Sequence, residues 1–173
     1  MREVHALSVA PDGTIGVGGV YERASAEHPD LPLPQNFDSA VALYEPDLRA
    51  RAQTAIAGPD FEYLYGLGVD GRGFRATGHY GEFNNGVDIG AFHLDSSGGR
   101  HAFLAHIASD GSVQDASALR GAGVIGRAVA RHPSGTWVVA GILRPGPLEP
   151  PGLPPVSAPE GSGFFGFVYV GWD

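Results

Sequence analysis

The chain has 173 residues, of which 43% are hydrophobic and 17% charged, so it is too apolar for a disordered protein and has the length of one domain. Its net charge is −8, and its eleven basic residues are all arginines scattered along the chain, which argues against nucleic acid as a partner because such binding needs clustered cations. Glycine (27) and proline (14) together approach a quarter of the residues and predict a fold rich in turns.

The sequence also bears on compartment and on cysteine chemistry. No apolar run reaches the roughly 18 residues that a membrane span needs, and residues 1–13 lack the apolar core of a signal peptide. We therefore expect a cytoplasmic protein, or an extracellular or cell-surface one if the chain is a fragment of an exported protein. With no cysteine, the chain has no disulfide, thiolate nucleophile or cysteine-ligated zinc.

Two linked blocks recur three times along the chain. In the first block a turn precedes a bulky apolar residue, and a glycine follows four positions later. An apolar position in the second block lies 21 to 25 residues beyond that glycine. Because both spacings recur, the chain is interpreted as three repeats in one domain, 1–173. The repeats cover about residues 4–60, 61–121 and 122–173, with first blocks at 11–19, 70–78 and 133–141 and second blocks at 38–47, 101–110 and 163–172.

Each repeat is predicted to form β-strands, because apolar and polar residues alternate between short turn dipeptides such as Asp12-Gly13. Residues 48–56 are compatible with a short helix, but the corresponding segment of the second repeat favours a strand. The prediction is four strands per repeat, a to d, with the third repeat ending at strand c. This makes eleven strands and no helix. We expect the recurring aromatics in the core: Phe74, Phe103, Trp137, Phe165, Phe167 and Tyr169.

A repeated four-stranded unit of about 60 residues is typical of a β-propeller blade. The second repeat, over residues 78–111, resembles the bacterial SBBP β-propeller repeat. His101 stands where that family usually has aspartate. The resemblance implies a propeller architecture and carries no catalytic motif. The matching residues are Thr77-Gly78, Val87-Asp88-Ile89-Gly90, Gly98-Gly99 and Ala102-Phe103-Leu104-Ala105.

Three blades do not close a propeller ring, which usually has four to eight. The last repeat also lacks its outer strand, and unpaired edges favour association. We expect either a homodimer that completes six blades from two half-rings or a larger chain that supplies the other blades. An open, stacked assembly is a third alternative.

Any ligand is expected on the face formed by the b–c loops, which are long in every repeat, whereas the a–b and c–d turns are tight. The alternative interpretation is that these loops are solvated caps of the blades. The candidate ligand-binding residues are Arg23, His28 and Asp30 in the first repeat, His79, Tyr80, Glu82, Asn84 and Asp88 in the second, and Arg144 in the third.

Two motifs in the loops have structural explanations as well as functional ones. Residues 144–150 fit a proline-rich SH3-type ligand, but seven prolines in 145–159 equally suit a rigid loop. Asn84, Asn85 and Asp88 could ligate Ca²⁺, but an Asn-Gly turn explains them better. The histidine spacing predicts no zinc site, and no cofactor is expected.

The function expected from the sequence is a non-catalytic β-propeller module that binds a protein or a glycan on the b–c face. No nucleophile elbow, metal motif or phosphate loop is present. The first alternative is a propeller hydrolase or lyase with its site at the ring centre. The second is a purely structural repeat protein that self-assembles.

Overall fold

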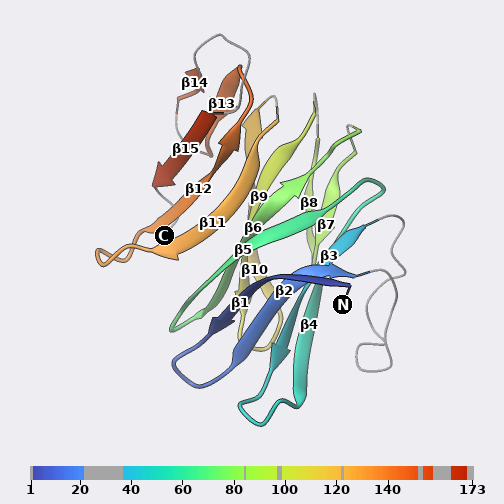
Figure 1. The fold of residues 1–173 in the computed structure, drawn as a ribbon, viewed down its shortest axis with the longest axis vertical. Coiled ribbons are helices and arrows are strands. Elements are labelled where there is room, and N and C mark those ends of the chain that lie inside the picture. Colours follow the sequence, from blue (N-terminus) through green and yellow to red (C-terminus); the bar gives the residue numbers. More distant parts are fainter. Residues whose placement is uncertain are drawn as a thin grey trace.

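The computed structural model describes residues 2–21, 37–83, 85–96, 99–121, 123–151, 154–157 and 165–170. These residues form fifteen strands and no helix, and 66% of them lie in strands. The strands make three antiparallel sheets, none of which closes on itself (Figure 1). The fold is therefore all-β, as expected. The described residues contain no helix long and apolar enough to span a membrane.

The main strands of each repeat form one sheet in chain order. The first sheet holds β1 (Glu3–Val9), β2 (Ile15–Tyr21), β3 (Asp38–Tyr44) and β4 (Ala50–Ala57). The second holds β5 (Tyr63–Asp70), β6 (Gly73–Tyr80), β9 (His101–Ala108) and β10 (Val113–Gly121). The third holds β11 (Ile125–Arg131), β12 (Trp137–Leu143) and β15 (Phe165–Val170). All eleven predicted strands are present, including the ambiguous segment that forms β4.

Two further hairpins lie inside segments predicted as loops. The pair β7 (Val87–Ile89) and β8 (Phe92–Leu94) comes from the second repeat but extends the first sheet beyond β4. The pair β13 (Pro147–Glu149) and β14 (Val156–Ser157) comes from the third repeat and extends the second sheet beyond β10. The first two sheets thus have six strands each, rather than the four predicted. Strands of two or three residues are too short to show an alternating pattern.

The sheets pack face to face, with β5 between β1 and β11 (Figure 1). Phe74 and Phe103 are fully buried in the core that includes residues of the first and second sheets, and Trp137 is buried in the core shared by the second and third. The core positions predicted for these three aromatics are confirmed, while the side chains of Phe165, Phe167 and Tyr169 lie outside what the structure describes. Glycine allows the close approach at Gly68, where a Cβ would lie 2.8 Å from the Trp137 ring.

The tight turns and the long loops lie at opposite ends of the strands. In the turn between β9 and β10, Asp110 accepts a hydrogen bond from the Ser112 amide at 2.9 Å, and Gly111 has a φ of 86°. An aspartate acceptor followed by a glycine with positive φ is suited to a two-residue turn. We call the opposite end, where β2, β6 and β12 finish and β5 begins, the loop end.

Candidate functional site

Seven ring side chains gather at the loop end around the start of β5. We call this group the aromatic cluster. It draws on the edge strands of two neighbouring sheets, on β6 and on three connecting segments. Its members, apart from the buried His79, are partly or largely open to solvent. The aromatic cluster consists of His5, Phe37, Phe61, Tyr63, Tyr65, His79 and Phe83.

The centre of the cluster is a group of nearly parallel rings. Tyr63 and Tyr65 on β5 have centroids 5.9 Å apart and an interplanar angle of 7°. His5 from β1 stacks on Tyr65 at 5.4 Å, and His79 from β6 stacks on Tyr63 at 5.2 Å. A β-bulge leaves Tyr65 without a partner on β6, since the register passes from Leu64 to Gly66. The Nδ1 of His5 lies 2.8 Å from the Leu64 carbonyl oxygen and joins β1 to β5.

A group of three phenylalanines continues the cluster beyond the first residue of β5. Phe37 and Phe61 stack at 5.5 Å, and Phe61 contacts Phe83 at 5.9 Å. Phe37 also lies 6.4 Å from Tyr63, so the two groups of rings are continuous. The Phe83 side chain is 62% exposed, which makes it the most open member of the cluster. An exposed large aromatic in contact with other rings is typical of a binding surface.

Arginines surround the cluster. The guanidinium of Arg127 on β11 lies 4.1 Å from the Tyr65 ring centroid, and that of Arg2 lies 4.9 Å from Phe37. Arg100 forms an ion pair with Glu82 nearby. Burial, and then the charges of Arg100 and Arg127, lower the pKa of His79 to about 3. His79 is therefore neutral at pH 7. Acidic groups border the cluster as well, since Glu3 lies 3.0 Å from the Nε2 of His5.

Buried carboxyl groups lie directly behind the cluster. Glu62 is between Phe61 and Tyr63 in sequence and is fully buried. Burial, together with the Asp38 carboxyl, raises the pKa of Glu62 well above its ordinary value, so Glu62 is neutral at pH 7. The same segment is held in place through Ser39, whose hydroxyl donates to the Glu62 carbonyl at 2.8 Å and accepts from the Leu64 amide at 2.9 Å.

Asp60 positions the segment that carries Phe83. Asp60 is 1% exposed. Its carboxylate accepts hydrogen bonds from the Phe83 amide at 3.0 Å and the Asn85 amide at 3.1 Å. The Asn85 side-chain amide donates a third bond at 2.7 Å. These three hydrogen bonds satisfy the buried carboxyl group and tie the segment that carries the exposed ring to the body of the protein.

The structure distributes the predicted site residues over several places. His79 belongs to the aromatic cluster, and Glu82 is at its margin through Arg100. Tyr80, the next residue after His79 on β6, is fully buried, and its hydroxyl donates to the Asp95 carbonyl at 3.0 Å. Arg23, His28, Asp30 and Asn84 lie outside the described residues.

Two other predicted residues are not at the cluster. Asp88 is exposed on the β7–β8 hairpin, where its carboxylate lies 2.7 Å from the His93 ring and raises the pKa of His93. Arg144 follows β12, and its side chain packs against Gly123, where a Cβ would lie 2.7 Å from Arg144 Cδ. The predicted residues therefore do not form one site.

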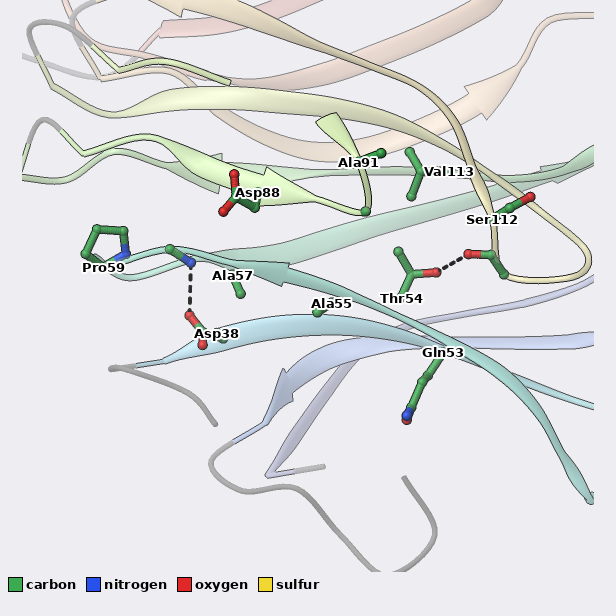
Figure 2. Close-up of a pocket in the computed structure, with 13 residues that line it drawn as sticks. Asp38, Gln53, Thr54, Ala55, Ala57, Pro59, Asp88, Ala91, Ser112 and Val113 are labelled. Atoms are coloured by element: carbon green, nitrogen blue, oxygen red, sulfur yellow. Dashed lines mark hydrogen bonds between the residues drawn. The ribbon is translucent and has the colours of Figure 1, made fainter. Parts of the chain in front are cut away.

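A separate pocket runs along β4, with a volume of about 660 Å³. Figure 2 shows Asp38, Asp88 and Pro59 toward one end and Thr54, Ser112 and Val113 toward the other. The Thr54 hydroxyl donates to the Gly111 carbonyl at 2.6 Å, so this group is already satisfied. Within the described ranges, no group of three histidine, aspartate or glutamate side chains is placed to hold a metal ion.

The prediction from sequence missed most of the aromatic cluster. It assigned the ligand to the b–c loops, whereas His5, Tyr63 and Tyr65 lie on strand a of the first two repeats. One sequence signal was present at residues 61–65, Phe-Glu-Tyr-Leu-Tyr, where aromatics alternate with other residues. Three aromatics at alternate positions lie on one face of a strand.

No protein-family model matches the chain, and no curated protein matches it in sequence. The geometry of the aromatic cluster therefore carries the functional argument.

Proposed function

We propose that the three sheets are successive blades of a β-propeller and that the protein is a non-catalytic module that binds its ligand on the aromatic cluster. The sheet order supports this architecture, because each sheet follows the chain outward from an inner edge strand, and β5 lies between the inner strands of its neighbours. The resemblance of residues 78–111 to the SBBP repeat is part of the same proposal. The single observation that carries the function is the continuous, partly exposed cluster of rings.

The two buried titratable groups at the cluster, His79 and Glu62, are not placed for catalysis, which favours binding. His79 is the buried histidine of the cluster, and in the described part of the chain neither of its ring nitrogens has a hydrogen-bond partner. A catalytic base is normally oriented by a carboxylate or a carbonyl and reaches its substrate. The Glu62 carboxyl is fully buried, so it is not placed to meet a substrate. A surface that binds its ligand by stacking needs neither an oriented base nor an accessible acid.

A panel of defined oligosaccharides and synthetic peptides tests the proposed function. The variant Phe83→Ala removes the most exposed ring at little cost to the core, because that side chain is 62% exposed. Val156→Ala is the matched control, since Val156 is 59% exposed on β14, at the outer edge of the second sheet. We expect at least one probe to bind, with Phe83→Ala weakening it at least tenfold and Val156→Ala leaving it unchanged. If Phe83→Ala left the affinity of every bound probe unchanged, the proposal would be refuted.

Self-assembly is the second candidate function, and it is favoured by a different observation. Val4, Leu7 and Val9 on β1 are 59%, 63% and 54% exposed. β1 is an edge strand, and an edge that exposes apolar side chains favours association with another copy of the chain. Light scattering on a size-exclusion column should then give twice the 18.0 kDa mass, and Leu7→Glu should restore the monomer. A monomeric wild-type protein would exclude this candidate.

A further inference from the structure

We infer that the ligand of the aromatic cluster is a short saccharide that carries a carboxylate, an inference that rests on the proposed function. The argument combines the ring geometry with the charge around it. A pyranose ring has a face of C–H groups that packs on the electron-rich face of an aromatic side chain. Phe83 offers such a surface, since it is 62% exposed, and the half-buried Phe61 lies against it.

The cluster has the form of a track rather than a single point of contact. Successive ring centroids lie 5.9 Å apart from Phe83 to Phe61, 5.5 Å on to Phe37, 6.4 Å on to Tyr63 and 5.9 Å on to Tyr65. An extended ligand of several rings can contact such a track along its length. The segment from Asp60 to Leu64 is already fixed by hydrogen bonds, so little conformational entropy is lost when a ligand stacks on it.

Arg127 supplies the charge complementarity. It is exposed on β11, its guanidinium lies over Tyr65, and the described residues give it no ion pair with a carboxylate. Arg100, by contrast, is paired with Glu82. A planar guanidinium at the end of an aromatic track is suited to a bidentate contact with a ligand carboxylate. A saccharide with an acidic sugar combines both required features, a stacking face and a carboxylate.

Charge density favours a saccharide over single-stranded nucleic acid, which also stacks on aromatic side chains. Every nucleotide brings a phosphate, and such binding depends on many cations along the track. Here Arg127 contributes one exposed guanidinium, Arg100 is paired with Glu82, and the chain carries −8. A protein partner is also less favoured, because a stable protein interface buries about 800 Å² on each side with roughly 20–30 residues, and the cluster consists of seven side chains.

Calorimetric titration with matched acidic and neutral probes tests the inference. The acidic probes are sialyllactose and trigalacturonate, and their neutral counterparts are lactose and the methyl ester of trigalacturonate. A thymidine oligonucleotide is the nucleic-acid probe. Arg127→Gln removes the charge, and Arg131→Gln is the control, because Arg131 is an exposed arginine at the far end of the same strand. Circular dichroism melts confirm that the variants fold.

We expect one acidic probe to bind the wild type at least tenfold more tightly than its neutral counterpart does, and to bind more weakly at high salt. The same probe should bind Arg127→Gln at least tenfold more weakly than the wild type. Its affinity for Arg131→Gln should equal that for the wild type. Equal binding of acidic and neutral probes, no binding of either acidic probe, or tighter binding of the oligonucleotide would each overturn the inference. If a neutral saccharide or a peptide still binds and depends on Phe83, the inference fails and the proposed function stands. If no probe of any class depends on Phe83, the proposed function fails as well.

Discussion

His79 makes the stability of the protein depend on pH in a way that a single substitution isolates. The imidazole is 3% exposed and stacks on Tyr63, and burial together with Arg100 and Arg127 lowers its pKa to about 3. In the unfolded chain the pKa is about 6.5. The unfolded state therefore binds a proton between these two values, while the folded state does not. Stability contributed by neutral His79 is present above pH 6.5 and is lost as the pH falls towards 3.

The magnitude follows from this difference in pKa. Each unit corresponds to about 1.4 kcal/mol, so lowering the pH from 7.5 to 4.5 should remove about 3 kcal/mol of stability through His79. Glu62 acts in the opposite direction, because its folded-state pKa is raised by burial and by Asp38. Its contribution is fully present below the unfolded pKa and is lost as the pH rises. The wild-type profile sums both effects, so the two residues have to be separated by variants.

Urea unfolding of the wild type and of His79→Phe at pH 7.5, 6.0 and 4.5 provides that separation. Phenylalanine keeps a ring against Tyr63 but cannot be protonated, and Trp137 fluorescence reports unfolding because that residue is buried. The stability difference between variant and wild type should change by about 3 kcal/mol across this range in favour of the variant at low pH. Effects of the other titrating groups cancel in the difference. A difference that stays constant from pH 7.5 to 4.5 would refute the burial of a neutral imidazole.

Three further substitutions test the packing of the sheets and the buried carboxyl group. Trp137→Ala should lower the free energy of unfolding by about 3–5 kcal/mol, because it leaves a cavity between the second and third sheets, and an unchanged thermal melt would contradict this placement. Gly68→Ala should cost about 1–3 kcal/mol, because its Cβ would lie 2.8 Å from the Trp137 ring, whereas Gly71→Ala, with no atom within 4 Å, should be close to neutral in the same urea titration. Glu62→Gln should stabilise the protein progressively as the pH rises above 4.5, since Glu62 of the unfolded wild type ionises there while the folded Glu62 stays protonated. If the variant's gain in unfolding free energy over the wild type were no larger at pH 8 than at pH 4.5, a protonated Glu62 would be contradicted.

The hairpins show where prediction from sequence reached its limit within the fold. The strands of the three repeats were predictable because alternation and turn dipeptides are local patterns, as in the segment that forms β6. The hairpins β7–β8 and β13–β14 were not predictable, because their strands have only two or three residues. Each hairpin also pairs with a sheet built by the preceding repeat. Their placement depends on the free edges of β4 and β10, which are remote in sequence.

The candidate site depended on tertiary structure even more strongly. The sequence by itself determined that Tyr63 and Tyr65 share one face of a strand, since side chains alternate with a period of two. It also predicted three repeats and long loops at one end of the strands. Only the packing of the sheets brought Arg2, Arg100 and Arg127 to that strand. These arginines are spread over 125 positions and appear scattered in the sequence. Arg2, next to β1, and Arg127, on β11, reach the cluster because β5 packs between those two strands.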